Sequence, residues 1–375
     1  MSIDIAHIQL RRMSMRLKHP FATSFGTIQD KDFFIIEAID SAGRTGYGES
    51  VAFSSPWYTE ETVETNLHMM QDFLIPLLKT NTLEHPDDIS RLFAPIRRNN
   101  MAKAALEGAV WDLYAKQKGI SLAAALGGTR SHVAVGVSIG IQPSTNALLA
   151  KIDQYVQAGY KRIKLKIKPG QDIEILTTVR NAFPNIMLMA DANSAYTLED
   201  THHLQQLDEL DLLMIEQPLA HDDIIDHATL QTAITTPICL DESIQSLTDV
   251  EKAHQLGSCR IINVKSGRVG GLSESKRIHD YCQKHHIPVW CGGMLESGIG
   301  RAHNIALASL PQFTLPGDIS GSARYWEKDI INPEIVVQDG YVTVPDGPGI
   351  GVSIDETALN TYTTEIKSFS MDHKA

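Results

Sequence analysis

The sequence predicts an α/β protein in which a TIM-like (β/α)8 barrel is joined to a smaller α+β segment. Two observations predict this fold. From about residue 132, seven short apolar runs alternate with amphipathic segments of helix length, and an eighth apolar run lies near residues 313–316. This alternation is typical of βα units around a parallel sheet. Before it, a group of strand-like segments precedes a group of helix-like segments, which is an α+β pattern.

The N-terminal part of the chain supplies the elements of the α+β segment. Three stretches have strand-like sequences: residues 3–17, 31–39 and 44–49. The last two are separated by Asp40-Ser41-Ala42-Gly43, a hairpin turn. Three helices are expected, over about residues 59–78, 87–97 and 101–117. Gly119 ends the last helix, and strand-like sequence within residues 340–375 is expected to return to this domain.

The barrel elements follow in regular order. The seven apolar runs are VAVGVSIG, RIKLKIK, IMLMADAN, LLMIEQP, ICLDES, RIINVKS and PVWCGGM. Intervening helices begin at capping residues such as Ser144 and Ser246. A doubly wound open sheet is the alternative, but the Gly-rich phosphate-binding fingerprint expected after its first strand is missing.

Composition limits the classes of function. The 375 residues include 33 Lys and Arg against 45 Asp and Glu, a net charge of −12, which argues against a nucleic-acid surface. With 43% hydrophobic residues the chain can bury a large core. No apolar stretch approaches the ~18 residues of a membrane span, and the first twenty residues lack the apolar core of a secretory signal. Four cysteines form no disulfide pattern, so a cytoplasmic protein is expected.

Charged residues recur at a fixed interval in the apolar strands. Lys166, Asp191, Glu216, Asp241 and Lys265 each follow an apolar run, at intervals of 25, 25, 25 and 24 residues. One βα unit is about this long, because ~250 residues make eight units. The five side chains are therefore expected at one level of the barrel mouth, where barrel active sites are built.

Three of these residues are carboxylates on adjacent strands. Hard oxygen ligands suit Mg²⁺, or another hard divalent ion such as Mn²⁺. No compact set of His and Cys residues favours zinc instead. Each acid could alone cap the helix after its strand, but equal spacing between flanking lysines favours Asp191, Glu216 and Asp241 as metal ligands.

The lysines bracket the acids. Lys164 and Lys166 are two residues apart on a strand, so they point to one face while Leu165 and Ile167 face the helices. Crowding of ammonium groups and a dication is expected to lower the lysine pKa from ~10.4 toward the range of about 7–8 that suits a base. Lys265 would act from the opposite side. This arrangement predicts removal of a proton next to a carboxylate, followed by racemisation or loss of a β leaving group.

Six motifs surround these residues: K-L-K at 164–166, D-A-N at 191–193, E-Q-P at 216–218, D-E-S at 241–243, N-V-K-S-G-R-V-G-G at 263–271 and G-G-M-L-E-S-G-I-G-R at 292–301. Together they resemble the muconate-lactonising branch of the enolase superfamily, in particular its o-succinylbenzoate synthase/N-succinylamino acid racemase group. The resemblance implies a modified barrel with an α+β capping domain formed by the N-terminal segment and the C-terminal return. Residues 20–26 are similar to the loop with which that domain closes the site. The expected division is 1–128 for the capping domain, 129–322 for the barrel, and 323–375 for a segment completing both.

The resemblance assigns roles to the charged residues. Lys166 would be the main acid/base, and Lys265 either a second base or a cation beside the enolate. Lys164 would be the electrostatic partner of Lys166. The three acids would hold Mg²⁺.

Substrate-contacting residues are expected at six positions: Asn193, Gly293, Met294, Ser24, Ser138 and Arg268. Each has a plainer alternative, such as a turn Asn, a tight glycine turn, a buried strand Ser or a surface Arg. Phe25, Trp57 and Tyr58 could shape specificity or only pack on the barrel. Ser320 departs from the D-x-D that dipeptide epimerases show after the eighth strand, which disfavours a dipeptide substrate.

The resemblance implies a Mg²⁺-dependent lyase that dehydrates 2-succinyl-6-hydroxy-2,4-cyclohexadiene-1-carboxylate in menaquinone biosynthesis. Racemisation of N-succinylamino acids is the alternative, because the group contains both activities. A barrel that has become a non-catalytic scaffold is disfavoured, because all the expected ligands and lysines are present. The expected partners are a small carboxylate substrate and further copies of the chain, with no nucleic acid and no membrane.

Overall fold

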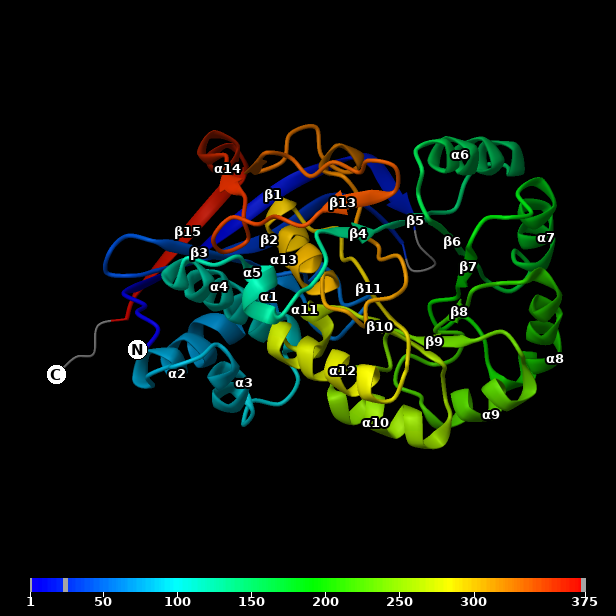
Figure 1. The fold of residues 1–375 in the computed structure, drawn as a ribbon, viewed down its shortest axis with the longest axis horizontal. Helices are drawn as coiled ribbons and strands as arrows, with labels where there is room; N and C mark the ends of the chain where they lie inside the picture. The colour runs from blue at the N-terminus through cyan, green and yellow to red at the C-terminus, as the bar shows by residue number, and fades with distance from the viewer. Residues whose placement is uncertain (1, 23–25, 372–375) are drawn as a thin grey trace.

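The structure is a computed structural model that describes residues 2–22 and 26–371. Its N-terminal domain contains a four-stranded antiparallel sheet in the order β15-β1-β2-β3. The strands are β1 (His7–Ala22), β2 (Thr27–Ile39), β3 (Thr45–Glu49) and β15 (Thr363–Ser370). The C-terminal strand β15 pairs with β1, so the first and last strands of the described chain lie side by side in one sheet (Figure 1). We call this sheet and its helices the capping domain.

Both faces of the sheet are buried, which explains the continuous apolar run of β2. Side chains alternate between the two faces of a strand. Phe34 and Ile36 pack into the core of the capping domain, whereas Phe33 and Ile35 belong to the larger core that includes the barrel. The predicted turn is present, with Asp40 N donating to Arg44 O at 3.0 Å.

The helices of this domain cover the sheet. They are α1 (Val63–Met69), a π-helical turn (Met70–Leu74), α2 (Ile75–Thr80), α3 (Asp87–Phe93), α4 (Asn100–Lys118) and α5 (Leu122–Leu126). The three predicted helices are therefore present, and Gly119 ends α4 in the left-handed conformation. A Cβ on Gly48 would lie 2.1 Å from Ala105 O, so glycine lets α4 pack closely on β3.

The barrel contains a seven-stranded parallel sheet in the order β11-β10-β9-β8-β7-β6-β5. Its strands are β5 (Gly136–Ile139), β6 (Arg162–Lys166), β7 (Leu188–Asp191), β8 (Ile215–Glu216), β9 (Ile238–Leu240), β10 (Ile261–Val264) and β11 (Val289–Cys291). The longer helices around it are α6 (Thr145–Gln157), α7 (Ile173–Ala182), α9 (Ile225–Ala233), α10 (Leu247–Leu256), α12 (Leu272–Lys284) and α13 (Gly298–Ala308). In Figure 1, α6 to α9 lie at the end of the molecule remote from the capping domain.

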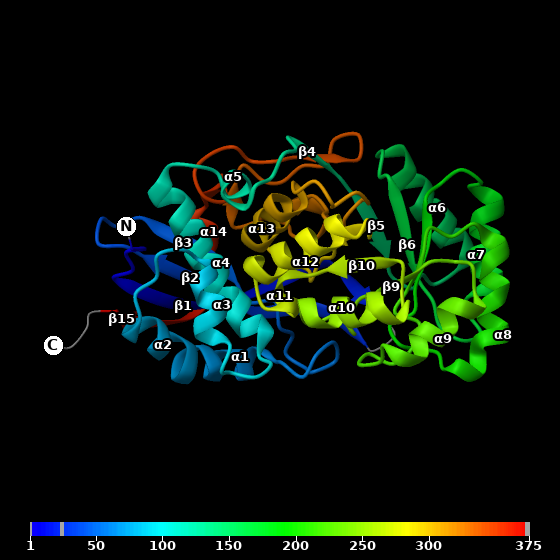
Figure 2. The ribbon, with the colours of Figure 1, turned by 60° about the horizontal axis from the view of Figure 1, so that its bottom comes forward.

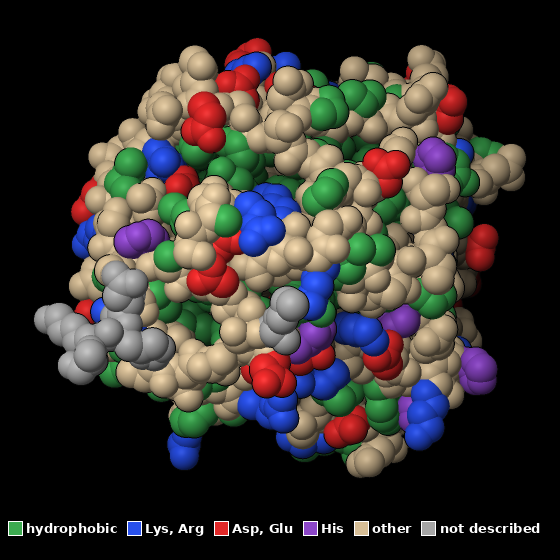
Figure 3. All heavy atoms as spheres, turned by 60° about the vertical axis from the view of Figure 1, so that its left-hand side comes forward, with side chains coloured by type: hydrophobic (Ala, Val, Ile, Leu, Met, Phe, Trp, Pro, Cys, Tyr) green, Lys and Arg blue, Asp and Glu red, His purple; other side chains and the backbone are tan. Residues whose placement is uncertain are grey.

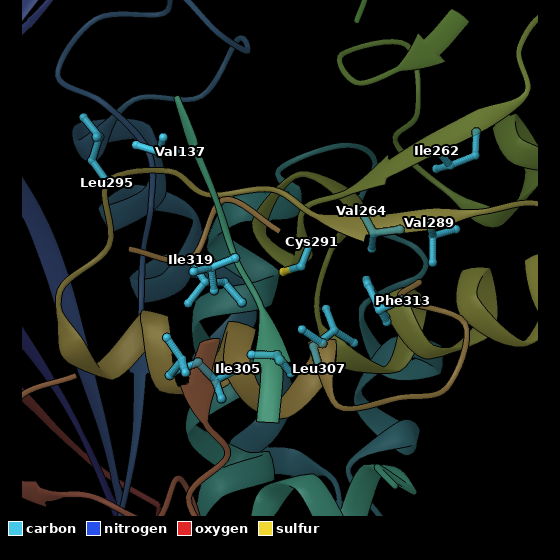
Figure 4. Close-up of a cluster of buried hydrophobic side chains, with 14 of the residues drawn as sticks. Val137, Ile262, Val264, Val289, Cys291, Leu295, Ile305, Leu307, Phe313 and Ile319 are labelled. Atoms are coloured by element: carbon cyan, nitrogen blue, oxygen red, sulfur yellow. The ribbon is translucent and has the colours of Figure 1, made fainter. Parts of the chain in front are cut away.

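The eighth position of the barrel is filled by an irregular segment. Residues 313–318 bridge β11 and β5, with Gly136 N donating to Gly317 O at 2.7 Å and Asp318 N donating to Cys291 O at 2.8 Å. Pro316 has no N–H to donate to a regular ladder. Figure 4 shows Phe313 beside Val289 in the apolar core of this region. The predicted barrel is therefore modified at its eighth strand.

Short elements complete the fold. They are β4 (His132–Ala134), α8 (Thr201–Leu204), α11 (Ser266–Val269), β12 (Ile331–Asn332), β13 (Tyr341–Thr343), β14 (Ser353–Ile354) and α14 (Glu356–Tyr362). On the face in Figure 3, acidic and basic side chains are intermixed. Within the described residues, every helix is too short or too polar to cross a membrane.

A buried carboxylate joins the two domains. Helix α4 lies beside α11 and α12 (Figure 2). The Glu107 carboxylate of α4 accepts hydrogen bonds from Leu272 N and, at 3.2 Å, from Ser273 N, at the start of α12. Burial raises the pKa of Glu107 to about 7. This carboxylate therefore stabilises the start of a barrel helix while its own charge is poorly solvated.

This raised pKa gives a testable pH dependence. With a pKa of about 7 when folded and 4.5 as its ordinary value, Glu107 favours folding most at low pH, and the contribution is lost as the pH rises through 7. Between about pH 5 and 8, the free energy of unfolding of the wild type should fall relative to that of Glu107→Gln by about 2–3 kcal/mol. Urea unfolding of both proteins across this range measures the difference, and a constant difference would contradict the raised pKa.

Candidate active site

The parallel register brings the evenly spaced charges to one end of the barrel. Lys166 pairs with Asp191, and Asp191 with Glu216, at the ends of β6, β7 and β8. Asp241 directly follows β9, and Lys265 directly follows β10. The five residues therefore lie at the carboxyl ends of five consecutive strands.

The lysines on β6 contact the first two acids. Lys166 Nζ lies 2.6 Å from Asp191 Oδ2 and 2.6 Å from Asn193 Oδ1. Lys164 Nζ lies 3.0 Å from Glu216 Oε2 and 3.3 Å from Asp191 Oδ2. Alternation along β6 thus directs both ammonium groups into the barrel, as the K-x-K spacing predicts.

The third acid has a separate set of partners. Lys265 Nζ donates to Asp241 Oδ2 at 2.8 Å, and Arg268 donates to Asp241 Oδ1. Tyr58, from the capping domain, donates its hydroxyl to Asp241 Oδ1 at 2.9 Å. Lys265 Nζ also donates to Tyr58 Oη at 3.0 Å. A capping-domain side chain therefore contacts both a predicted catalytic lysine and a predicted metal ligand.

The expected lowering of the lysine pKa is wrong for Lys164 and Lys265 in this structure. Burial lowers the pKa of Lys164, but the carboxylates of Asp318, Glu216 and Asp191 outweigh burial and raise it well above its usual value. Burial lowers the pKa of Lys265 as well, but the charges of Asp241, Tyr58 and Glu216 together outweigh burial and raise it. The sequence suggests repulsion between cations, whereas in the structure each of these ammonium groups lies against carboxylates.

The acids are themselves crowded. Burial and the neighbouring Asp191 raise the pKa of Glu216 to about 8. Burial, followed by the charge of Asp241, raises the pKa of Glu242 to about 7. Glu242 Oε1 accepts a hydrogen bond from Asn193 at 3.1 Å, and its buried Oε2 has no hydrogen-bond partner among the described residues. Ionisation of all the acids at this end of the barrel is therefore unfavourable, because their carboxylates are buried and close together.

Three buried carboxylates on adjacent strands have the donor chemistry of a hard divalent cation. As placed in the structure, these side chains turn toward ammonium groups, and no group of three His, Cys, Asp or Glu residues in the described parts of the chain surrounds one cation position. The three carboxylates therefore fit a hard cation by their chemistry and by the crowding of their charges. In the structure, the ammonium groups of the three lysines balance those charges.

A partly open cavity of about 100 Å³ lies over the lysines. Lys164, Lys166 and Lys265 line it, whereas Asp191, Glu216 and Asp241 do not. Its remaining barrel lining comes from Ser138, Asn193, Gly293, Met294, Leu295, Glu296, Asp318, Ser320 and Tyr325, and its capping-domain lining from Phe21, Ile28, Phe53, Trp57 and Tyr58. The cavity therefore combines cationic groups at its base with an apolar roof.

The expected substrate-contacting residues divide into three groups. Asn193, Gly293, Met294 and Ser138 line the cavity, and the Ser138 hydroxyl is buried with no hydrogen-bond partner among the described residues. Arg268 is 1% exposed and does not line the cavity, because it lies against Asp241 and Tyr58. It is therefore not a surface arginine. Ser24 lies outside the described residues, as does Phe25.

Two charged residues that line the cavity, Glu296 and Asp318, are missing from the predicted site. Asp318, in the irregular eighth segment, forms an ion pair with Lys164 at 2.7 Å and another with Arg162. Burial raises the pKa of Asp318, but the two cations outweigh burial and hold that pKa well below its usual range. Arg162, Lys164 and Lys166 are spaced two residues apart, so all three side chains leave the same face of β6. Three cations on one buried face need nearby carboxylates, and this spacing is the signal that could have indicated an acid beside Arg162 and Lys164.

A barrel whose mouth holds three lysines and three buried carboxylates beneath a separate domain is the architecture of an enzyme that moves protons. Residues 6–127 match the family described as mandelate racemase / muconate lactonizing enzyme, N-terminal domain, and residues 147–358 match enolase C-terminal domain-like. The chain belongs to this family of the enolase superfamily.

Curated relatives align over nearly the whole chain. o-Succinylbenzoate synthase of Geobacillus kaustophilus is 59% identical over 98% of each chain. o-Succinylbenzoate synthase of Bacillus subtilis is 54% identical over 98% of this chain and 99% of the relative. N-succinylamino acid racemase of Thermus thermophilus is 48% identical over 92% of this chain and 94% of the relative.

Solved structures have the same fold. An enolase superfamily member from Listeria innocua superposes with a TM-score of 0.96 at 48% identity, over 98% of this chain and 100% of the other. A dipeptide epimerase from Cytophaga hutchinsonii, solved with Mg and a dipeptide, has a TM-score of 0.87 at 24% identity, over 98% of this chain and 100% of the other. The second similarity concerns the fold alone.

Proposed function

We propose that the protein catalyses the o-succinylbenzoate synthase reaction, the Mg²⁺-dependent dehydration of 2-succinyl-6-hydroxy-2,4-cyclohexadiene-1-carboxylate. The observation that carries this proposal is that Lys166 and Lys265 line one cavity, where Lys166 is paired with Asp191 and Lys265 with Asp241. The identity of 59% with a synthase that aligns end to end supports the substrate.

The reaction needs a base and a site for the leaving hydroxyl. Lys166, as the neutral amine, removes the proton on the carbon next to the substrate carboxylate, and the C–H electron pair passes into the enolate. Collapse of the enolate breaks the C–O bond at the neighbouring carbon, and the Lys166 ammonium returns its proton to the departing hydroxide as water. Lys265, on the opposite side, stabilises the negative charge of the enolate as a cation.

The remaining groups prepare the site. Asp191, Glu216 and Asp241 would hold Mg²⁺, which supplies Lewis-acid stabilisation of the substrate carboxylate when bound. Lys164 lies among the acids and balances their charge. Asn193 positions Lys166 through its 2.6 Å contact.

The cavity suits the rest of the substrate. Gly293, Met294 and Ser138 form barrel walls against which the ring and the succinyl chain can lie. Aromatic side chains of the capping domain cover the opening and exclude water from the enolate.

We also propose the division 1–128, 129–322 and 323–375 for the capping domain, the barrel and the segment that completes both.

The test is to assay the purified protein with the cyclohexadiene carboxylate and with an N-succinylamino acid, each with Mg²⁺, with Mn²⁺, and with a chelator. Formation of o-succinylbenzoate that stops on chelation supports the proposal. Exchange of the α-proton in D2O follows the first step independently. Absence of both turnover and exchange in the presence of Mg²⁺ would overturn it.

Racemisation of N-succinylamino acids is the second candidate. Lys265 faces the cavity from the opposite side to Lys166, which is the placement that a second base requires, and the Thermus thermophilus relative carries the racemase name. A racemase adds the proton to the face opposite the one from which it was removed, so both lysines exchange protons.

Replacement of Lys265 by arginine separates the two activities. Arginine keeps a cation beside the enolate but does not become a neutral base, because its pKa is above 12. We expect Lys265→Arg to retain at least about tenfold more synthase than racemase activity, each relative to wild type. Steady-state rates with the two substrates measure this ratio. Equal losses would contradict the proposed division of roles.

A further inference from the structure

The loop between β11 and α13 forms one wall of the cavity. Gly293, Met294 and Leu295 line the cavity, and Leu295 has a φ of 58°. A left-handed backbone is unfavourable for a leucine, so surrounding contacts must hold the loop in this shape.

Part of that support comes from the barrel. Glu296 Oε1 accepts hydrogen bonds from Met294 N at 2.8 Å and from Asn304 Nδ2 at 2.9 Å. Glu296 O accepts one from Arg301 Nη2 at 2.6 Å. These contacts fix the loop on both sides of Leu295 but leave the Leu295 carbonyl and the start of α13 to other partners.

The capping domain supplies most of those partners, and Asp329 of the C-terminal segment accepts a hydrogen bond from Gly298 N at 2.8 Å. Lys31 on β2 donates to Leu295 O at 2.8 Å and lies 3.1 Å from Glu49 Oε1 at the end of β3. The Glu49 carboxylate accepts from Ser297 N at 3.0 Å, from Ser297 Oγ at 2.6 Å and from Gly300 N at 2.9 Å. The Lys31 and Glu49 side chains are 1% and 0% exposed. A buried ion pair of one domain thus holds the loop of the other.

Neither member of the pair lines the cavity, so its effect on substrate must pass through the loop. Glu49 accepts four hydrogen bonds from Lys31 and α13 and stabilises the start of that helix by its charge. A Cβ on Gly300 would lie 2.8 Å from Glu49 Oε2, so the helix approaches the carboxylate closely. Lys166 and Lys265 are held separately, by Asp191 and Asp241.

We propose that the Lys31–Glu49 pair is a positioning device that shapes the substrate wall formed by Gly293, Met294 and Leu295. This inference rests on the proposed function for its kinetic readout. Loss of the pair relaxes the wall while the proton-transfer lysines keep their partners. The expected signature is a rise in KM with little change in kcat, because the lost interaction serves binding and not the chemical step.

The test compares Glu49→Gln with Glu107→Gln as a matched control. Both changes neutralise a buried capping-domain carboxylate that accepts backbone N–H groups at the start of a barrel helix, but Glu107 contacts α12 and not the cavity loop. We expect Glu49→Gln to raise KM about tenfold, with kcat within about twofold, and Glu107→Gln to leave KM unchanged.

Hydrogen–deuterium exchange provides a readout that needs no turnover. Amides of residues 292–300 should exchange faster in Glu49→Gln than in wild type, and at the wild-type rate in Glu107→Gln. If Glu49→Gln does not fold, Lys31→Met is used, because it keeps the buried stem and the contacts of Glu49 with α13 while removing the donor to Leu295 O. The same rise in KM and exchange is expected.

The outcomes separate the two proposals. A wild type with no turnover on either substrate overturns the proposed function, and faster exchange in the variant still supports the positioning device. Unchanged KM and unchanged exchange in a folded Glu49→Gln or Lys31→Met protein overturn the positioning device. An equal rise in KM in Glu107→Gln also overturns it, because that result would reflect domain docking in general.

Discussion

Replacement of Lys166 by alanine is expected to lower kcat by about 10³-fold or more, because the change removes the group that accepts the α-proton. The Lys166 ammonium lies 2.6 Å from Asp191 Oδ2 and 2.6 Å from Asn193 Oδ1, and it lines the cavity. The measurement is o-succinylbenzoate formation together with α-proton exchange in D2O. Both should be lost, because both begin with the same proton transfer.

The control distinguishes chemistry from folding. Lys168, two residues beyond the end of β6, is exposed and does not line the cavity, so Lys168→Ala should turn over substrate at the wild-type rate. Circular dichroism and the melting temperature of Lys166→Ala should resemble those of wild type. Retained proton exchange in folded Lys166→Ala would refute its role as the base.

The positions of the site residues could be predicted because they follow from two periods. Strand alternation places Lys164 and Lys166 on one face, and the length of a βα unit places Lys166, Asp191 and Glu216 at one level. Both periods are properties of the local chain. The sequence of this one protein therefore suffices to place these residues together at one end of the barrel.

The surroundings of those residues depend on contacts between distant segments. Tyr58 reaches Asp241 across 183 positions and Glu49 reaches Ser297 across 248, and neither distance has a periodic signal. The direction of the lysine pKa shifts depends on which carboxylates each ammonium meets, so the rule of like-charge crowding gave the wrong sign for Lys164. The eighth segment forms only isolated bridges, because Pro316 has no N–H to donate to a strand ladder. The apolar composition of residues 313–316 nevertheless resembles that of a strand.

Replacement of Glu216 by glutamine is the second change with a large expected effect. The side chain is fully buried in the middle of the three acids, where it contacts Lys164 and accepts a hydrogen bond from Asn263 at 2.7 Å. Glutamine keeps the volume but replaces the ionisable carboxyl group, and with it one anionic oxygen ligand, by a neutral amide. If Glu216 is a metal ligand, the Mg²⁺ concentration for half-maximal activity should rise by about 10²-fold or more, since loss even of residues that only support metal ligands costs 10–100-fold.

The comparison variant is Glu242→Gln. It neutralises a second buried carboxylate of the same crowded region, which is hydrogen-bonded to Asn193. If the effect of Glu216→Gln arose only from the change in local charge, both variants would shift the Mg²⁺ titration alike. A direct ligand predicts a larger shift for Glu216→Gln, measured by activity and by calorimetric titration of the metal-free protein with MgCl2. An unchanged titration would contradict ligation by Glu216, and the cation would then have to depend on Asp191 and Asp241, whose present partners are the lysines on opposite sides of the cavity.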